Sequence, residues 1–352
     1  MTRQRVTIRE VAEAAGVSTQ TVSRVLNNRP DVAPETFDRV QQIIAEVGYS
    51  PNMLARGLTQ GRSHVLGVVA FGVEYFGPTR VLTGIESRAA EMGYSITLNL
   101  IHRPETDDVN GVLEGLVSRQ VDGVLWAIPQ VGRNLDWWPE RAKRLPTPVV
   151  LVGGMAGQGS LPSVGIDNRT IGRLAAEHLI AGGARRVGLI TGPSRWWEAR
   201  EREAGWRETL AQSGLDGVTG PVAEGDWSAT SGEAGLHQLL AASPDIDAVF
   251  ASNDQMALGV LHAAHALGLR VPEDLSVVGV DDIAEGKHFW PPLTTVHQPL
   301  IDAGIQAVTG IDEDIRRLAQ RRRPAEPRAP WTMRLQPRLI VRESSRPPRQ
   351  AI

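Results

Sequence analysis

Two groups of side chains in this chain of 352 residues have the composition of a binding site. The first lies in residues 18–27, where Gln20 and Arg24 stand four positions apart among hydroxyl-bearing residues. A Gln amide can bond an adenine edge through two atoms and an Arg guanidinium a guanine edge in the same way. Short side chains such as Ser18 suit phosphate oxygens. This chemistry favours contact with double-stranded DNA.

The second group combines a guanidinium, an indole, an amide and a carboxylate in Arg200, Trp227, Asn253 and Asp281. The polar groups can bridge neighbouring hydroxyls, and an indole face can cover the apolar side of a sugar ring. Trp227 stands among polar residues at 224–228, which favours a ligand contact over core packing. The group therefore predicts a saccharide site.

Short helices at the N-terminus must position the first group. In residues 7–15 the apolar side chains recur with helical spacing, and Thr7 begins a capping box. Gly16 ends that helix, Ser18 caps a second one, and a third follows Pro34. This arrangement predicts a helix-turn-helix whose second helix enters the major groove. The alternative is a three-helix bundle whose polar face has no role.

An alternating α/β body must position the second group. Apolar runs predict strands at 65–71, 95–101, 121–128, 149–152, 187–191, 248–252 and 277–280, with helices at 81–92, 170–181 and 254–268. This pattern is typical of doubly wound parallel sheets, and its length exceeds one comfortable core. We therefore expect two lobes meeting at a cleft, where ligands lie beyond the carboxyl ends of the strands.

Composition excludes several classes of protein. The sequence has no cysteine, which excludes disulfide frameworks and thiolate metal sites, and we expect no cofactor or metal. Residues 1–16 are too polar for a signal peptide, and the longest apolar stretch, 65–73, is far shorter than the roughly 20 residues that cross a bilayer. We expect a cytoplasmic protein.

Charge is distributed unevenly. Residues 1–62 hold eight Arg against six Asp and Glu, a net charge of +2, whereas the whole chain carries −3. Residues 321–352 hold nine Arg, two Glu and six prolines. We expect this end to be a solvated extended tail, with an auxiliary nucleic-acid contact as the alternative.

Residues 6–28 resemble the DNA-binding head of the LacI/GalR family of bacterial repressors, and residues 49–58 are similar to its hinge helix. The resemblance implies that Leu58 wedges into the minor groove. Gly57 weakens this hinge by about 1 kcal/mol relative to Ala. The candidate DNA-binding residues are Thr7, Ser18, Thr19, Gln20, Thr21, Ser23, Arg24, Asn27, Asn52, Ala55, Arg56 and Leu58.

The body resembles the same family at 192–206, 224–228, 253–259, 276–282 and 291–298. The resemblance implies an inducer pocket that includes Arg200, Trp227, Asn253, Asp281 and Gln298, and further aromatic residues are expected around its mouth. The candidate effector-binding residues are Phe71, Tyr75, Trp126, Trp196, Trp197, Arg200, Trp227, Asn253, Asp281 and Gln298.

The resemblance implies an organisation and a function. We expect a helix-turn-helix domain at 1–50, a hinge at 51–62, a two-lobed, periplasmic-binding-protein-like effector and dimerisation domain at 63–342, and a basic Pro-rich tail at 343–352. The expected function is a homodimeric, nucleoid-associated bacterial repressor of sugar-catabolism genes. We expect a saccharide, for example a β-galactoside-like one, to release it from a pseudo-palindromic operator.

Three alternatives stay open. The first is the same DNA-binding regulator with a nucleobase, a nucleoside or a protein co-regulator as its effector. The second is a sugar-carrying solute-binding protein, against which the front helices argue. The third is an enzyme using Asp281 and Asp282, but adjacent residues at a strand end point apart, whereas glycosidase carboxylates face each other. His262 and His265 are interpreted as packing or surface residues and not as metal ligands.

Overall fold

The computed structural model describes residues 6–26, 28–49, 62–103, 109–131, 145–154, 161–214, 217–320 and 330–348. The chain divides into two compact units, a head of residues 1–63 and a body of residues 64–352. Each unit is a separate packed structure. Within the described residues, no helix is both long and apolar enough to cross a membrane.

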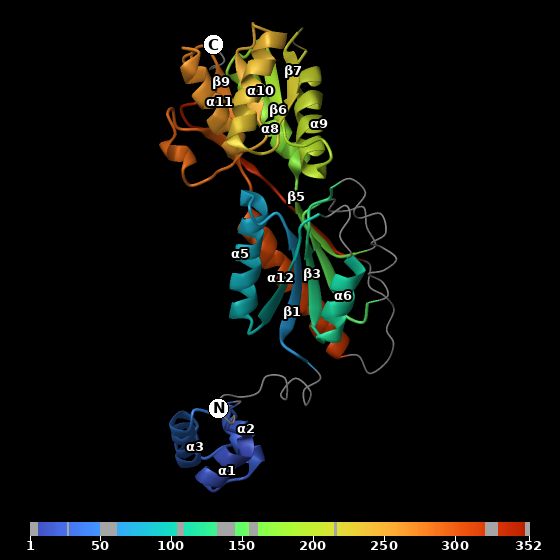
Figure 1. Ribbon diagram of the computed structural model, residues 1–352, viewed down its shortest axis with the longest axis vertical. Coiled ribbons are helices and arrows are strands. Elements are labelled where there is room, and N and C mark those ends of the chain that lie inside the picture. Colours follow the sequence, from blue (N-terminus) through green and yellow to red (C-terminus); the bar gives the residue numbers. More distant parts are fainter. Residues whose placement is uncertain are drawn as a thin grey trace. The chain divides into compact units, whose positions relative to one another are not determined.

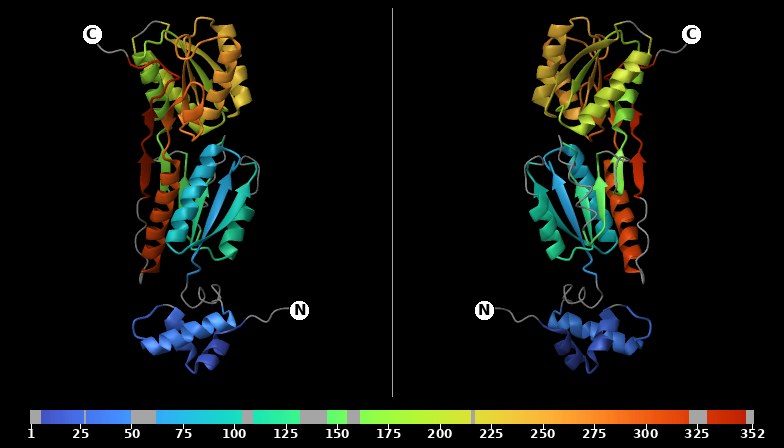
Figure 2. Two further views of the ribbon diagram at one scale, coloured as in Figure 1. Left: turned by 90° about the vertical axis from the view of Figure 1, so that its left-hand side faces the viewer. Right: turned by 90° about the vertical axis from the view of Figure 1, so that its right-hand side faces the viewer.

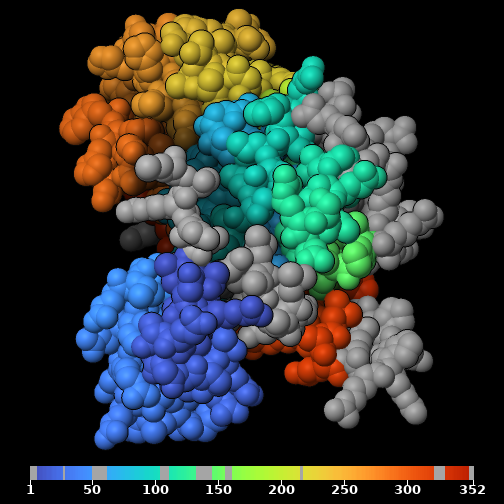
Figure 3. Space-filling view, turned by 60° about the horizontal axis from the view of Figure 1, so that its bottom comes forward, coloured from blue at the N-terminus to red at the C-terminus, as the bar shows by residue number. Residues whose placement is uncertain are grey.

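The head consists of α1 (Ile8–Ala15), α2 (Thr19–Leu26) and α3 (Pro34–Val47), which form one closely packed body, blue in Figure 3. The predicted capping box is present, since Thr7 and Glu10 bond each other's backbone N–H groups. Gly16 ends α1 with a φ of 64°, a left-handed conformation that suits glycine. The helices bury their apolar stripes against one another, with Val22 and Val40 fully buried.

The first lobe of the body is a parallel sheet with strand order β11-β5-β4-β3-β1-β2. Helices α5 and α12 cover one face and α6 the other (Figure 1). The elements are β1 (Val65–Phe71), α5 (Phe76–Glu91), β2 (Ser95–Ile101), α6 (Val109–Ser118), β3 (Gly123–Ala127), β4 (Val149–Val152), β5 (Ser163–Ile166), α12 (Leu300–Ala319) and β11 (Thr332–Leu335).

The second lobe repeats this plan with strand order β12-β10-β9-β8-β6-β7, parallel except for β12. Helices α8 and α9 cover one face, and α10 and α11 the other. The elements are α8 (Asn168–Ala181), β6 (Val187–Thr191), α9 (Trp197–Gln212), β7 (Thr219–Glu224), α10 (Ala229–Ala242), β8 (Ala248–Ala251), α11 (Asp254–Ala266), β9 (Ser276–Asp281), the 3-10 turn η1 (Gly286–His288), β10 (Thr294–His297) and β12 (Arg338–Ile340).

The chain passes between the lobes three times. It crosses from β5 to α8, from β10 to α12 and from β11 to β12, each time within a few residues (Figure 2). Because all three crossings are short, residues at their ends lie between the two sheets. Side chains such as Asn168 and Gln298 are therefore placed where both lobes can contact a ligand.

The predicted fold class is confirmed, but the strand prediction was incomplete. All seven predicted strands exist, whereas β5, β7, β10, β11 and β12 were not predicted. These strands give a weak apolar signal: β7 contains Gly220 and Pro221, and β10 contains Thr294 and Thr295, whose polar side chains are buried. Pairing with neighbouring strands of the sheet, and not apolar composition, makes these residues strands.

The prediction of a solvated tail is wrong for residues 330–346. This stretch supplies β11 and β12, and Ser344 and Ser345 beyond them are buried in the second lobe. The Ser344 hydroxyl donates to the carbonyl of Val277 at 2.7 Å and accepts from the Thr294 N–H at 2.8 Å. Hydrogen bonds to the sheet therefore hold this segment in place despite its basic, Pro-rich composition.

Candidate functional site

The outer face of α2 carries the polar residues predicted to read DNA. Val22 and Val25 point into the head, whereas Thr19, Gln20 and Arg24 are exposed. Arg24 lies 3.6 Å from Asp31 in an exposed ion pair, which leaves the guanidinium accessible. The face has the shape and chemistry that a major groove accepts.

Other candidates in the head also have a local structural role. The Ser18 hydroxyl accepts from the Thr21 N–H at 3.1 Å and so caps α2, as Thr7 caps α1. Thr21 and Ser23 are half-buried. The remaining candidates lie outside the described residues, and these are Asn27, Asn52, Ala55, Arg56 and Leu58, together with residues 51–61 of the hinge predicted at 51–62.

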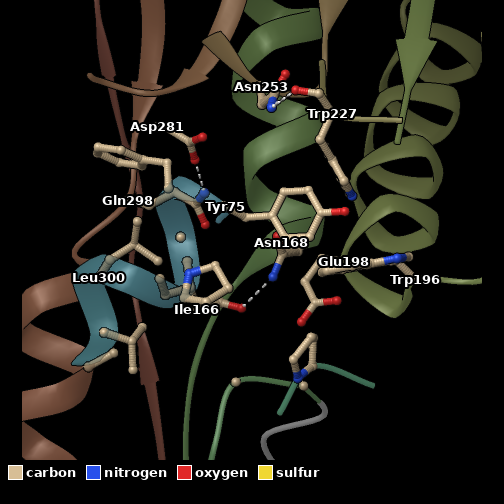
Figure 4. Close-up of a pocket in the computed structure, with 18 of the residues that line it drawn as sticks. Tyr75, Ile166, Asn168, Trp196, Glu198, Trp227, Asn253, Asp281, Gln298 and Leu300 are labelled. Atoms are coloured by element: carbon tan, nitrogen blue, oxygen red, sulfur yellow. Dashed lines mark hydrogen bonds between the residues drawn. The ribbon is translucent and has the colours of Figure 1, made fainter. Parts of the chain in front are cut away.

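A cavity of about 220 Å³ lies between the two lobes of the body (Figure 4). Its walls come from the carboxyl ends of strands, from the first turns of α5, α9, α11 and α12, and from the crossing segments. The polar and aromatic residues of its lining are Glu74, Tyr75, Phe76, Asn168, Trp196, Glu198, Arg202, Trp227, Asn253, Gln255, Asp281 and Gln298.

Aromatic rings form one side of this cavity. The ring centres of Trp196 and Tyr75 lie 5.6 Å apart, and those of Trp196 and Trp227 lie 5.7 Å apart. The first lobe contacts the same region through a β-bridge between Val131 and Trp196. Phe71 packs behind, with its ring centre 5.8 Å from that of Trp196. Both lobes thus contribute to one aromatic wall.

Charged and amide groups form the opposite side. The Arg202 guanidinium donates to Asn168 Oδ1 at 2.8 Å and to the Ser252 carbonyl at 2.5 Å, and it lies 5.7 Å from the centre of the Trp227 ring. Gln298 donates to Asp281 Oδ1 at 2.5 Å. These bonds hold the side chains in fixed positions around the cavity.

Burial perturbs the acids near the cavity. It raises the pKa of Asp281 to about 6, although the nearby Arg202 charge and the Gln298 hydrogen bond oppose the shift. Burial and the Asp281 charge together raise the pKa of Asp254, which accepts from Thr295 at 2.6 Å. Burial also raises the pKa of Glu198. Three buried acids, Asp281, Glu198 and Asp254, therefore act electrostatically on the buried Arg202 guanidinium.

Asn253 links the cavity to two elements of the second lobe. Its Oδ1 caps α11 by accepting from the Met256 N–H at 2.8 Å, and its Nδ2 donates to the Trp227 carbonyl at 2.9 Å. The Trp227 backbone has a φ of 75°, which is uncommon for a residue with a side chain. The Asn253 bond thus fixes the loop that presents the indole.

Comparison with known proteins agrees with this geometry. Residues 7–52 match the family described as bacterial regulatory proteins, lacI family, and residues 176–345 match the periplasmic binding protein-like domain. The chain is 34% identical to the lactose operon repressor of Escherichia coli (strain K12) over 295 residues, 83% of this chain and 80% of that protein. It is 35% identical to the HTH-type transcriptional regulator CelR of Thermobifida fusca over 352 residues, 97% and 99% of the two chains.

The chain belongs to the LacI family. Its structure is similar to that of the lac repressor dimer bound to operator and the anti-inducer ONPF, with a TM-score of 0.83, 30% identity and coverage of 97% and 99%. It is also similar to the CelR–cellobiose complex, with a TM-score of 0.68, 31% identity and coverage of 97% and 100%. This LacI-family chain is a DNA-binding transcriptional repressor.

In the part of this LacI-family protein that the structure describes, Asp281 and Asp282 are not directed at one shared reacting bond. Asp281 bonds Gln298, whereas Asp282 bonds Arg342 at 2.6 Å and His297 at 3.2 Å. The two neighbouring acids therefore point to different partners, as the sequence indicated. Within the described ranges, no three His, Asp or Glu side chains are grouped to hold a metal ion.

The structure brings six of the predicted effector residues into the cavity lining and leaves four outside. Inside are Tyr75, Trp196, Trp227, Asn253, Asp281 and Gln298. Phe71 packs behind the aromatic wall, and Trp126 is a core residue of β3 with 2% exposure. Trp197 begins α9 and donates its N–H to the Gln130 carbonyl at 2.9 Å, outside the lining.

The placement of Arg200 in the pocket was wrong. Its guanidinium is exposed and donates to the carbonyls of Ser194 and Arg195 at 3.0 and 2.9 Å. Arg202, two residues later, is 6% exposed and lines the cavity. The difference is one of helical phase, because two positions along α9 rotate a side chain to the far side of the helix.

Sequence reasoning also missed Glu198, Asn168 and Gln255. A signal for α9 was present, since its buried stripe of Ala199, Arg202, Gly205, Trp206 and Leu210 has the 3–4 spacing of a helix. Arg202 falls on that stripe and Arg200 does not. Asn168 has no comparable signal, because only the crossing from β5 to α8 places it at the cavity.

Proposed function

We propose that this LacI-family protein is a homodimeric repressor of sugar-catabolism genes, which a saccharide releases from a pseudo-palindromic operator. The observation that carries the proposal is the cavity between the lobes, where the Trp227 indole stands beside Asn253, Asp281 and Gln298. An indole face next to carboxylate and amide groups suits a sugar, because a sugar ring has apolar C–H faces and an edge of hydroxyls.

Two relatives support a saccharide effector. The lac repressor has been solved bound to ONPG in the repressed state, and CelR as a complex with cellobiose. The CelR match spans nearly the whole of this chain, so the cavity is included in it. We therefore take a saccharide, such as a β-galactoside or a cellobiose-like disaccharide, as the effector class.

The DNA side of the proposal rests on α2. Gln20 and Arg24 are exposed on it and would contact base edges, while residues 51–62 would act as the hinge. A homodimer presents two such helices and so reads two half-sites related by a twofold axis. Trp290, 90% exposed in the second lobe, offers apolar surface for the contact between two copies.

Selection of duplexes from a random pool by the purified protein, followed by anisotropy titration of the selected duplex, tests the proposal. We expect lactose, cellobiose or a related sugar to release the duplex. By reciprocity, the duplex should weaken sugar binding by the same factor. Release by a nucleobase and not by any sugar would contradict the saccharide assignment, and equal sugar affinity with and without duplex would contradict the coupling.

The reading residues can be separated in the same assay. Arg24→Ala should cost about 1 to 3 kcal/mol of binding free energy at one base position, since a bidentate contact to one guanine is lost. Arg29→Ala, an exposed Arg beyond α2, is the matched control, and it should not change base preference. Uniform weakening over all base variants of the duplex by Arg24→Ala would argue against base reading.

A further inference from the structure

One acid in the cavity lacks a partner for half of its carboxylate. Glu198 lies in the first turn of α9 and lines the cavity, with its side chain directed into it (Figure 4). Its Oε2 is buried and has no hydrogen-bond partner within the described structure. A buried carboxylate oxygen in a native protein normally has a donor, so this atom is expected to bond a group that enters with the ligand.

Two more buried polar atoms of the lining share this condition. Trp227 Nε1, a donor, and Gln255 Oε1, an acceptor, have no partner among the described residues. The cavity thus offers two acceptors and one donor that the protein itself does not satisfy. Sugar hydroxyls both donate and accept, and so can satisfy all three atoms.

The backbone opposite Glu198 is free of side chains. Gly153 and Gly154 follow β4 of the first lobe with φ values of 89° and 69°, and the Gly154 backbone opposes the rise that burial causes in the pKa of the Glu198 carboxyl. A Cβ on Gly153 would meet no atom within 4 Å. The Glu198 carboxylate therefore extends from the second lobe toward first-lobe backbone at the cavity.

The charge of the lining points to the kind of ligand. Glu74, Glu198 and Asp281 oppose the single guanidinium of Arg202. Arg202 already donates to Asn168 and to Ser252. The Glu198 carboxylate would repel an anionic group placed near it, the described lining holds no cation besides Arg202 to receive that group, and burial would strengthen the repulsion.

We propose that Glu198 is a specificity-determining residue, whose carboxylate accepts hydrogen bonds from hydroxyls of a neutral saccharide and excludes saccharides that carry a phosphate or carboxylate. The inference rests on the proposed function, because it names the chemistry of the effector for the same cavity. It assigns the discrimination to one side chain that the sequence did not single out.

Calorimetric titration of the full chain tests this role. The probes are glucose, lactose and cellobiose as neutral sugars, and glucose 6-phosphate and glucuronic acid as acidic ones. Glu198→Gln keeps the shape and removes the charge, and exposed Glu285→Gln removes the same charge far from the cavity lining. Glu198→Gln should weaken the best neutral sugar about 10- to 100-fold, as expected for hydrogen bonds to a charged group, and Glu285→Gln should change it less than twofold.

Stability separates this role from a structural one. If Glu198 stabilises the fold, Glu198→Gln should have a lower melting temperature than the wild-type protein. If Glu198 instead waits for a ligand hydroxyl, Glu198→Gln should have an unchanged or higher melting temperature, because a buried charge has been removed. Binding of the selected duplex without sugar should match that of the wild-type protein, which reports correct folding.

Four results would overturn the inference. Unchanged sugar affinity in Glu198→Gln, or a lower melting temperature with affinity lost, would remove Glu198 as the determinant and leave the saccharide proposal standing. Tighter binding of glucose 6-phosphate or glucuronic acid than of glucose would contradict the claim that Glu198 excludes anionic saccharides, and would leave the saccharide proposal standing. Failure of every sugar to bind the wild-type protein would instead overturn the proposed function, and this inference with it.

Discussion

Replacement of Arg202 is the sharpest test of the cavity, because Arg200 provides a matched control on the same helix. Arg202 is buried and makes two charge-assisted hydrogen bonds, to Asn168 and to Ser252, at 2.8 and 2.5 Å. Arg202→Ala removes one cation and leaves two acceptors without donors. Arg200→Ala removes one cation from the solvent-exposed side of α9.

The expected cost follows from these contacts. Hydrogen bonds to charged groups contribute about 1.5–3 kcal/mol each, and removing one member of a buried charged group costs about 3–5 kcal/mol. We therefore expect Arg202→Ala to lower the free energy of unfolding of the body by about 3–5 kcal/mol, which is a large fraction of the roughly 5–15 kcal/mol typical of a domain. Arg200→Ala should stay within about 0.5 kcal/mol of the wild-type value.

Arg202→Lys distinguishes the shape of the side chain from its charge. A single ammonium cannot reach both acceptors as the guanidinium fork does, so this variant should be less stable than the wild-type protein and bind sugar more weakly. Urea denaturation followed by tryptophan fluorescence measures stability, and calorimetry measures sugar affinity. If Arg202→Ala and Arg200→Ala showed the same midpoint and the same affinity, the burial argument for Arg202 would be refuted.

Three further predictions address the acid cluster, the head and the helix packing. Burial raises the pKa of Asp281 from 3.8 to about 6, so its contribution to stability is fully present below about pH 4 and is lost as the pH rises through 6, a change of about 3 kcal/mol. Urea denaturation from pH 4 to 7.5 should show this loss of stability in the wild-type protein and not in Asp281→Asn. Parallel pH profiles of the two proteins would contradict the prediction. Thr7→Ala removes the α1 cap and should destabilise the head by about 1 kcal/mol, which amide hydrogen exchange in α1 measures; unchanged exchange would exclude a capping role. Gly205→Ala should lower the free energy of unfolding by about 1–3 kcal/mol, since a Cβ there overlaps the Arg169 carbonyl where α8 and α9 cross. The control is Gly115→Ala in α6, whose Cβ meets only the end of a flexible side chain and which should be neutral or stabilising. Thermal melts of the two variants measure the difference.

The head could be predicted from its sequence because its signals are local. The capping box at Thr7, the Gly16 turn and the apolar stripes each lie within a few residues, and the structure contains all of them. The polar face of α2 follows directly from helical phase. That those side chains contact base edges is a prediction, which the titration of base variants tests.

The body was predicted less completely because part of its architecture depends on distant contacts. Long apolar runs identified seven strands, whereas short strands such as β10, with its buried Thr294 and Thr295, owe their conformation to neighbours far along the chain. Ser344 and Ser345 show the same effect, since their hydroxyls are buried only because β9 and β10 provide partners.

By itself the sequence determined the three helices of the head, seven strands of the alternating α/β body, and which family the chain resembles, because periodicity and motif spacing are properties of neighbouring residues. Tertiary structure alone decided that Asn168 lies at the cavity, and that Glu198 of the second lobe lies near Gly154 of the first. The physical reason is that burial and charge pairing arise between segments that only the folded chain brings together.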